Sequence, residues 1–481
     1  MGKKLSEMEN QIAVTTVKQI GEQLIIPEGM TTEQAMHLLD RHRRYQEEET
    51  SISRTFPVFP WDGAYALSQV LIEKFGWAPA EPTPGFFGNR PPRLIDIEVD
   101  YNKKVQIAWG RFSIPTVEEG YLECDVAFKD NQLCFSLSSV VLRKDEQVIE
   151  EIFDAIEAKV KTHSIYAGKA FKIRFRDDKG RRLDMPTPEF LRTDHVSKDM
   201  LIYNDDVQDA IQTNLFTPIE RINDCVANDI PVKRGVLLGG PYGTGKTLAA
   251  TVASRLAVDA GVTYLYVPRA DELGDAINFA KQYQSTACVI FCEDIDRAVH
   301  GERSVEMDDI LNILDGIDTK GNKIITVLTT NHLENINPAM LRPGRLDAVI
   351  DVAAPNASTI EKLIHLYGKG TVEVDSDLSE VSKALEGNGI IPATVAEVVK
   401  RAKLAQIGLQ PTGTQVQVLT PEALLVAAKT MRKQVDDLAS LQRTEPPATL
   451  DSVMSDIIKT KVENSLEDVT NQVEEIYSAT V

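Results

Sequence analysis

The chain has 481 residues, with 52 Lys+Arg against 72 Asp+Glu and a formal net charge of −20. This length is too great for one compact core and predicts about two to four domains. The acidic balance argues against broad nucleic-acid binding, which needs a basic surface to displace counterions. No apolar run approaches the roughly 18 residues that span a bilayer, and the N-terminus lacks the apolar segment of a signal peptide. We therefore expect a soluble, cytoplasmic protein without a membrane span, and we do not expect nucleic acid as a partner.

Residues 1–90 are predicted to form a helical N-terminal region followed by a proline-rich linker. The stretch TTEQAMHLLDRHRRYQEEE begins with an N-cap, at Thr31 or Thr32, and then carries apolar side chains at helical spacing. The linker PAEPTPGFFGNRPP is too rich in proline and glycine to form a regular element.

Residues 91–195 are predicted to form a small β-rich domain of the α+β class. Alternating runs separated by turn residues predict an antiparallel sheet. These runs are RLIDIEVD, KVQIAWGRFSI, YLECDVAF and LCFSLSSVVL. The stretch EQVIEEIFDAIEAKVK predicts an amphipathic helix. Its apolar stripe comprises Val148, Ile149, Ile152, Phe153, Ile156 and Val160. The run AFKIRFRD predicts one more strand of this domain.

Residues 196–355 alternate helical patterns with short, apolar, β-branched runs. These runs are GVLLGG, TYLYVP, CVIFCED and KIITVLTTN. The alternation predicts an α/β domain, a parallel sheet wound by helices. Residues 356–440 are predicted to be all-helical. Residues 441–481 are predicted to be an acidic linker and an amphipathic helix, which suits either pairing with another helix or packing on its own domain.

The five cysteines show no spacing typical of a metal site. Cys288 and Cys292 flank an apolar strand. We therefore predict that they are buried thiols of the core.

The sequence GPYGTGKT, from Gly240 to Thr247, matches G-x-x-x-x-G-K-[ST] at every fixed position. It follows a predicted strand and opens a predicted helix, which argues against a chance glycine-rich turn. Its glycines let backbone N–H groups surround phosphates, and the helix N-terminus adds a favourable dipole. We expect Lys246 to contact the β- and γ-phosphates of ATP and the Thr247 hydroxyl to ligate Mg²⁺. The predicted nucleotide-binding residues are Pro241, Tyr242, Gly243, Thr244, Gly245, Lys246, Thr247 and Leu248.

Polar side chains also end the next predicted strands. Glu293 and Asp294 follow CVIFC, and Asn331 follows IITVLTT. One carboxylate is expected to hold a magnesium-bound water and the other to orient the attacking water. We assign Glu293 to the metal, Asp294 to the water and Asp296 to a structural role, and we expect Asn331 to sense the γ-phosphate or hold the water. The usual order is aspartate before glutamate, so a working site, an impaired site and a subfamily arrangement all remain open.

Two arginines lie in a Pro-Gly turn of the segment NPAMLRPGRLD. Arg342 and Arg345 are three residues apart, which would present two guanidinium groups outward. Each alone would be assigned to a surface salt bridge. In this order after the other motifs, the pair instead predicts arginine fingers that reach the γ-phosphate of a neighbouring subunit.

Together, GGPYGTGKT, the strand-end carboxylates, TTN and LRPGRLD resemble the AAA+ ATPases over about residues 200–435. The resemblance implies an α/β P-loop NTPase fold with a helical lid, formed here by PATVAEVVKRA and TPEALLVAAKTMRKQ. It also implies ATP and Mg²⁺ as cofactors, catalytic roles for the carboxylates, Asn331 and the arginines, and a homo-oligomeric ring of about six or seven subunits.

A narrower resemblance rests on EDID, LNILDGID and TTNHLENINPAMLRPGRLD. These segments are similar to the cytochrome-bc complex assembly ATPases, the mitochondrial translocases of the Rieske iron–sulfur protein. Members of that family carry Glu-Asp at this strand end, so the resemblance favours a working site. The family has an N-terminal membrane span, which is not expected here.

A second departure concerns the pore. Many AAA+ unfoldases carry an aromatic-apolar-glycine loop after the strand that corresponds to TYLYVP. Here the segment RADELGDAINFAKQY contains no aromatic-glycine pair. We therefore expect a folded client to be moved or remodelled, rather than an unfolded chain to be threaded.

Three functions compete. The favoured one is a ring-forming ATPase that remodels or translocates an unidentified protein client, with residues 91–195 as client or adaptor surface. A nucleic-acid remodeller or loader is disfavoured by the acidic balance and by the lack of a recognisable DNA-binding motif. A low-turnover, ATP-gated scaffold stays open because of the exchanged carboxylates.

Overall fold

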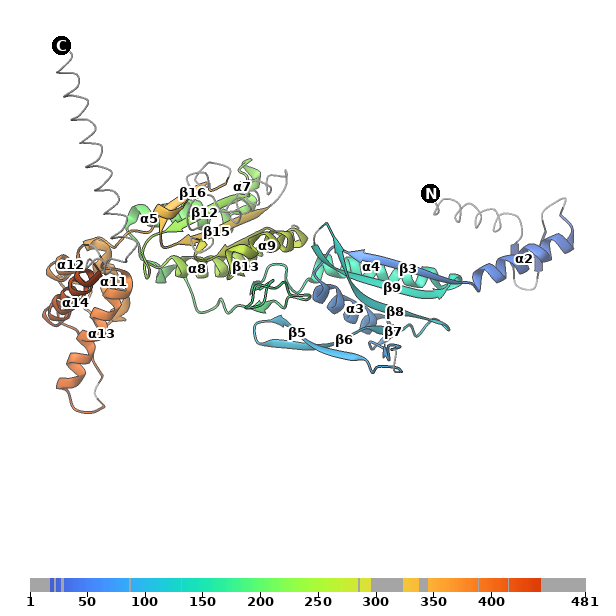
Figure 1. Cartoon of the computed structure of the whole chain (residues 1–481), viewed down its shortest axis with the longest axis horizontal. Coiled ribbons are helices and arrows are strands. Elements are labelled where there is room, and N and C mark those ends of the chain that lie inside the picture. Colours follow the sequence, from blue (N-terminus) through green and yellow to red (C-terminus); the bar gives the residue numbers. More distant parts are fainter. Residues whose placement is uncertain are drawn as a thin grey trace, which may run out of the picture. The chain divides into compact units, whose positions relative to one another are not determined.

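The computed structural model describes residues 18–20, 23–26, 30–85, 88–130, 132–283, 286–295, 323–336, 345–387, 389–413 and 415–442 (Figure 1). The chain divides into two compact units. The first comprises Met1–Leu201 and Asp205–Val352, and the second Ile202–Asn204 and Ala353–Val481. Within the described ranges, we find no helix whose length and apolar character would let it cross a bilayer.

The described chain begins with a short hairpin and a helix. The hairpin is β1 (Lys18–Ile20) with β2 (Gln23–Ile25), and the helix is α2 (Thr32–Gln46). Thr31 is the N-cap of α2: its Oγ1 accepts from the Gln34 backbone N–H at 3.2 Å, and Gln34 Oε1 accepts from the Thr31 N–H at 3.0 Å. This reciprocal capping box satisfies two backbone donors and places the start of the helix after Thr31.

The β-rich part of the first unit contains an antiparallel sheet in the order β3-β9-β8-β7-β4. These strands are β3 (Glu49–Phe56), β4 (Ala80–Glu81), β7 (Arg111–Ser113), β8 (Gly120–Lys129) and β9 (Gln132–Leu142). A separate hairpin pairs β5 (Arg93–Asp100) with β6 (Lys103–Trp109). Two helices, α3 (Pro60–Phe75) and α4 (Glu146–His163), pack against each other and against β9 (Figure 1).

The predicted amphipathic helix is confirmed as α4. Its buried residues are Ile149, Ile152, Phe153 and Ile156, all from the predicted stripe. Helix α3 has Pro60 in its first turn and ends at Gly76, whose φ of 81° is the left-handed conformation that stops a helix.

The second part of the first unit is a sheet in the order β11-β10-β13-β14-β15-β12-β16. Every neighbouring pair in it is parallel except β10 with β11. The strands are β10 (Ala170–Lys172), β11 (Glu189–Phe190), β12 (Arg234–Gly239), β13 (Thr263–Val267), β14 (Cys288–Cys292), β15 (Ile324–Thr330) and β16 (Ala348–Asp351). The helices are α5 (Asp205–Ile211), α6 (Thr217–Glu220), α7 (Ile222–Ala227), α8 (Lys246–Asp259) and α9 (Leu273–Ala280). The four predicted strands are thus confirmed, and so is the predicted class of a parallel sheet wound by helices.

Two parts of the predicted domain division are wrong. Strand β3 belongs to the β-rich sheet, although residues 1–90 were predicted to be helical and linker. The strand predicted from AFKIRFRD is β10, and it pairs with β13 of the parallel sheet, not with the β-rich domain. Alternation of apolar residues identifies a strand but does not identify the strand it pairs with. Here the partner lies far along the chain, since Ala170 pairs with Tyr264.

One hydrophobic core runs from the β-rich sheet to the parallel sheet. An aromatic junction lies at its centre, made of Phe59, Tyr166, Phe171, Phe190, Phe279 and Tyr283. The ring centroids of Phe59, before α3, and Phe279, in α9, are 5.1 Å apart. Phe171 in β10 lies 5.7 Å from Phe279. Edge-to-face packing of fully buried rings makes the two parts of this unit one packed body.

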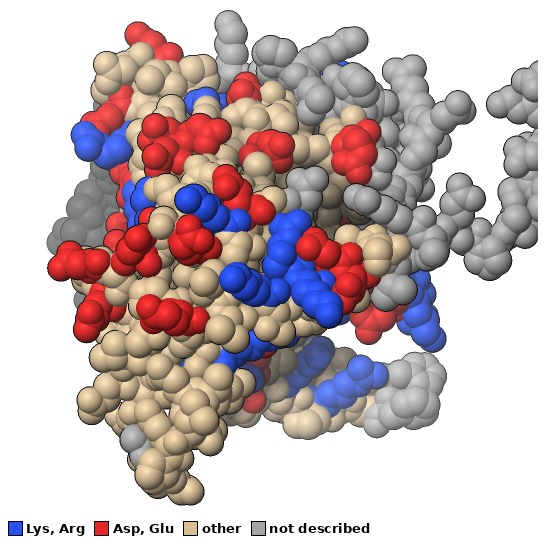
Figure 2. Space-filling view, turned by 90° about the vertical axis from the view of Figure 1, so that its left-hand side faces the viewer, with Lys and Arg blue, Asp and Glu red and all other residues tan. Residues whose placement is uncertain are grey.

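The second unit contains helices α11 (Ala357–Gly368), α12 (Ser379–Leu385), α13 (Pro392–Leu409) and α14 (Pro421–Gln442) around its own core. The predicted helical lid is therefore present. Residues 404–420 contain no Asp, Glu, Lys or Arg. They correspond to the uncharged lower projection in Figure 2, where the rest of the face carries acidic and basic side chains together. Leu404 and Leu409, in α13, are exposed.

Asp62 is a buried carboxylate beside the aromatic junction. Its side chain is 1% exposed and accepts hydrogen bonds from the Ile165 N–H at 2.9 Å and the Ser164 hydroxyl at 2.5 Å. These bonds tie α3 to the segment after α4. Burial raises the pKa of Asp62 to about 6, although both hydrogen bonds lower it.

The raised pKa of Asp62 predicts a pH-dependent stability. The folded state binds this proton more tightly than the unfolded state, so the contribution is full below the unfolded pKa and is lost as the pH rises through about 6. Between pH 5.5 and 7.5 the wild type should lose about 1 kcal/mol of unfolding free energy relative to Asp62→Asn. Urea unfolding at both pH values measures this difference. Asp125 is exposed, so Asp125→Asn is the control and should show the same pH dependence as the wild type. The prediction would be wrong if the unfolding free energies of the wild type and Asp62→Asn differed by the same amount at both pH values.

Candidate nucleotide-binding site

The predicted phosphate loop, Gly240–Gly245, connects β12 to α8 (Figure 1). Gly240 has a φ of 135°, and a Cβ atom there would lie 2.4 Å from the Val352 carbonyl oxygen. Gly243 and Gly245 have φ values of 77° and 98°. Such left-handed glycines let successive backbone N–H groups curl around an anion, as phosphate binding requires.

Lys246 begins α8 and is 6% exposed. Its ammonium donates to the carbonyl oxygens of Gly240 at 2.6 Å and Pro241 at 2.8 Å, and to Oδ1 of Asn331 at 2.9 Å. The charge is therefore held against the loop itself and against the end of β15. A phosphate bound in the loop would meet this ammonium directly.

The other predicted loop residues lie around this lysine. Thr244 is buried, and its hydroxyl donates to the Pro241 carbonyl at 2.9 Å, which stabilises the loop from inside. Tyr242 is exposed, with its ring edge-on to His332 at 6.5 Å. Leu248 is half-buried in the first turn of α8.

Glu293 follows β14 and is held at both carboxylate oxygens. Oε1 accepts from the Thr247 hydroxyl at 2.7 Å, and Oε2 accepts from the Tyr266 hydroxyl at 2.8 Å. The Tyr266 ring stacks on Phe291 with centroids 5.3 Å apart. Burial, followed by the hydrogen bond to Glu293, raises the pKa of Tyr266, so the hydroxyl is a donor at neutral pH.

Asp294 has a different environment. Its φ of 49° is left-handed, which is uncommon for a residue with a side chain. Its N–H donates to the Thr329 hydroxyl at 3.2 Å, and its Oδ1 accepts from Nδ2 of Asn331 at 2.8 Å. Asn331 therefore bridges Asp294 and Lys246. The two adjacent carboxylates thus have separate partners, one on the Thr247 side and one on the Asn331 side.

The sequence did not single out Tyr266. It lies in TYLYVP, near the end of β13, and it pairs in register with Phe291 of β14. A search for polar groups at the ends of all neighbouring strands would have found it, because parallel strands end at the same edge of the sheet.

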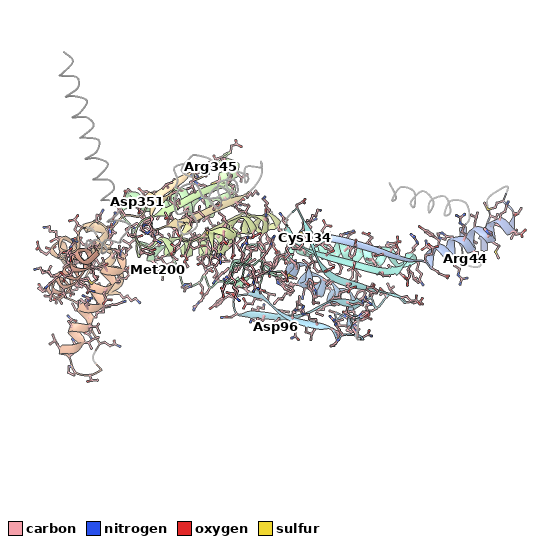
Figure 3. The ribbon with its side chains drawn as sticks, viewed as in Figure 1. Arg44, Asp96, Cys134, Met200, Arg345 and Asp351 are labelled. Carbon is pink, nitrogen blue, oxygen red and sulfur yellow. The ribbon has the colours of Figure 1, made fainter. Side chains whose placement is uncertain are left out.

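The predicted arginines are only partly described. Arg342 and Asp296 lie outside the described residues. Arg345 precedes β16, and a Cβ atom at Gly235 would lie 2.1 Å from its carbonyl oxygen. Figure 3 labels Arg345 and Asp351 at opposite ends of β16. Arg345 is thus near the amino end of β12, whereas Lys246 lies beyond the carboxyl end.

The donor set fits magnesium. The Thr247 hydroxyl and the Glu293 carboxylate are hard oxygen ligands, with the joined oxygens 2.7 Å apart. Mg²⁺ prefers such oxygens and is usually bound by one or two protein groups together with waters and phosphates. The neighbouring thiols are not part of this set: Cys288 and Cys292 are buried in β14, and burial raises the pKa of both to about 12.

Comparison with known proteins matches residues 236–354 to the family "ATPase family associated with various cellular activities (AAA)". Among curated proteins, the chain is 27% identical over 266 residues to the ATP-dependent zinc metalloprotease FtsH 1 of Conexibacter woesei, covering 50% of this chain and 38% of the relative. It is 33% identical over 174 residues to 26S proteasome regulatory subunit 10B homolog A of Arabidopsis thaliana, covering 32% of this chain and 43% of the relative.

The chain therefore spans less than half the length of these relatives. The matched range contains the loop after β12, the end of β14, the end of β15 and β16. Residues 236–354 therefore match the AAA family, and over this range the chain is similar to the ATPases named above.

Proposed function

We propose that the chain forms a homo-oligomeric ring that uses ATP hydrolysis to remodel or translocate a protein client. The observation that carries the ATPase site is the convergence of three strand ends. Lys246 and Asp294 share Asn331, while Thr247 and Glu293 are joined directly. A phosphate-binding lysine, a metal-binding hydroxyl and two carboxylates are the groups that ATP hydrolysis requires.

The two environments support separate roles for the carboxylates. Glu293 with Thr247 would hold Mg²⁺, because the two already share a hydrogen bond. When bound, Mg²⁺ neutralises charge on the phosphates. Asp294 would orient the attacking water, and Asn331 would fix the position of its carboxylate. Lys246 would exchange a contact with the loop for one with the phosphates.

The position of Arg345 supports action on a neighbouring subunit. Strand β12 has six residues, which corresponds to roughly 20 Å between its two ends. Arg345 lies at the amino end of this strand and the phosphate loop at its carboxyl end. A guanidinium placed there is too far from its own nucleotide, so Arg345, together with Arg342, would complete the site of the next subunit.

The shared core supports work on a folded client. Helix α9 follows β13 after the connection Pro268–Glu272 and carries Phe279 into the aromatic junction. The segment that would carry a pore loop therefore packs against the β-rich part. Motion of the parallel sheet would therefore move the β-rich part as a rigid body, and its surface would contact the client or an adaptor.

The chain also resembles the cytochrome-bc complex assembly ATPases in its Glu-Asp order. Because that family translocates a folded protein, the resemblance supports the proposal of a folded client. We also propose that the protein is cytoplasmic.

The division of labour between the carboxylates predicts different defects. Glu293→Gln should weaken nucleotide binding about 10-fold in Mg²⁺ and leave binding in EDTA unchanged. Asp294→Asn should bind ATP normally and lose turnover about 100-fold or more. Binding of a fluorescent ATP analogue and steady-state phosphate release separate the two. The opposite pattern of defects would assign Asp294 to the metal and Glu293 to the water. Normal turnover in both variants would show that neither residue acts in hydrolysis.

The arginines predict complementation between subunits. Arg342→Ala with Arg345→Ala should lose turnover about 1000-fold while the protein stays assembled. Mixing this variant with Asp294→Asn should restore part of the turnover, because some sites then combine an intact Asp294 with intact neighbouring arginines. Each variant mixed with itself is the control. Unchanged turnover in the double variant would contradict the arginine-finger assignment.

The client is tested by trapping. Asp294→Asn loaded with ATP should retain a protein client that mass spectrometry identifies, because hydrolysis no longer releases it. Lys246→Ala is the matched control and should retain none. Equal capture by both would contradict ATP-dependent client binding, and capture of nucleic acid would favour a nucleic-acid remodeller. Tight ATP binding with barely measurable wild-type turnover would instead favour a scaffold gated by ATP.

A further inference from the structure

The Tyr266 hydroxyl is the feature from which a further role follows. Tyr266 lies in β13, one strand away from Glu293, and β13 pairs with β14 in parallel. The hydroxyl reaches past the end of β14 to Oε2 of Glu293 at 2.8 Å. Thr247, from α8, occupies the other oxygen at 2.7 Å. The carboxylate is therefore fixed between two elements of the fold.

A glutamate at this position needs such support. Its side chain has one more rotatable bond than aspartate, so it loses more rotamer freedom when it is held in one orientation. An ionised carboxylate accepts hydrogen bonds through both oxygens. Within the described part of the chain, the side-chain donors to Glu293 are Thr247 and Tyr266. Thr247 is also the predicted metal ligand, so Tyr266 is the donor that stays available to orient Glu293 when the site is loaded.

We propose that Tyr266 is a positioning residue that holds Glu293 in the orientation needed for the Mg²⁺–nucleotide complex. The inference rests on the proposed assignment of Glu293 to the metal side. It also accounts for the exchanged order of the two carboxylates. The longer Glu293 reaches the metal side because Tyr266, on the neighbouring strand β13, secures its far oxygen, and Asp294 is left to pair with Asn331.

The same strand supplies a matched control. Tyr264 lies two residues earlier, and its ring is also close to Phe291, with centroids 6.4 Å apart. Its hydroxyl donates to the Ala250 carbonyl at 2.8 Å, not to a carboxylate of the site. Tyr264→Phe and Tyr266→Phe therefore remove the same group from the same strand, but only the second changes the surroundings of Glu293.

The test measures the affinity for a fluorescent ATP analogue in Mg²⁺ and in EDTA, without turnover. The dissociation constant in EDTA divided by the dissociation constant in Mg²⁺ reports how strongly the metal contributes to binding. Tyr266→Phe should lower this ratio about 10-fold and leave the affinity in EDTA unchanged. Tyr264→Phe should keep the wild-type ratio. A structural role alone would lower stability or both affinities and leave the ratio as it is.

A second comparison shows whether Tyr266 acts through Glu293. In a Glu293→Ala background, Tyr266→Phe should have no further effect on the ratio, because no carboxylate remains to be oriented. A wild-type ratio that persists in Tyr266→Phe would overturn this inference alone. A wild type with equal affinity in Mg²⁺ and EDTA would overturn the assigned metal site and this inference with it.

Discussion

The parallel pairing of β12, β14 and β15 is the constraint on which the site depends. β15 lies between the other two strands, with Gly239 opposite Thr330 and Cys292 opposite Leu328. All three strands therefore end at one edge of the sheet, and the residues that follow them meet there. The phosphate loop, the carboxylate pair and Asn331 are distant in sequence but within hydrogen-bonding distance in space. Without this pairing, none of them would form a site.

The two adjacent carboxylates differ in their contacts and in the backbone conformation of Asp294. Glu293 contacts Thr247 and Tyr266, whereas Asp294, in a left-handed conformation, contacts Asn331. Strained backbone of this kind persists where the surrounding contacts impose it, as the Thr329 hydroxyl does at the Asp294 N–H. Both carboxylates therefore have hydrogen-bond partners, which supports the proposal of a working site.

The aromatic junction decides how the β-rich part is joined to the parallel sheet. Phe59 and Tyr166 come from the β-rich side, and Phe171 and Phe279 from the parallel sheet and its helix α9. Buried aromatic rings in contact leave little freedom for hinge motion within this unit. In the proposed function, the β-rich part then moves together with the parallel sheet. Helix α9, which follows β13, joins the two through Phe279.

Local patterns determined several features by themselves. Short apolar, β-branched runs predicted β12 to β15, helical periodicity predicted α4, and the glycine and lysine spacing predicted the phosphate loop, because each depends on neighbouring residues only. The sequence did not indicate the sheet of β3, the partner of β10 or the contact of Tyr266 with Glu293. These depend on pairing between strands far apart in the chain. Tertiary structure alone decided them, because a strand's own residues do not encode which neighbour completes its hydrogen bonds.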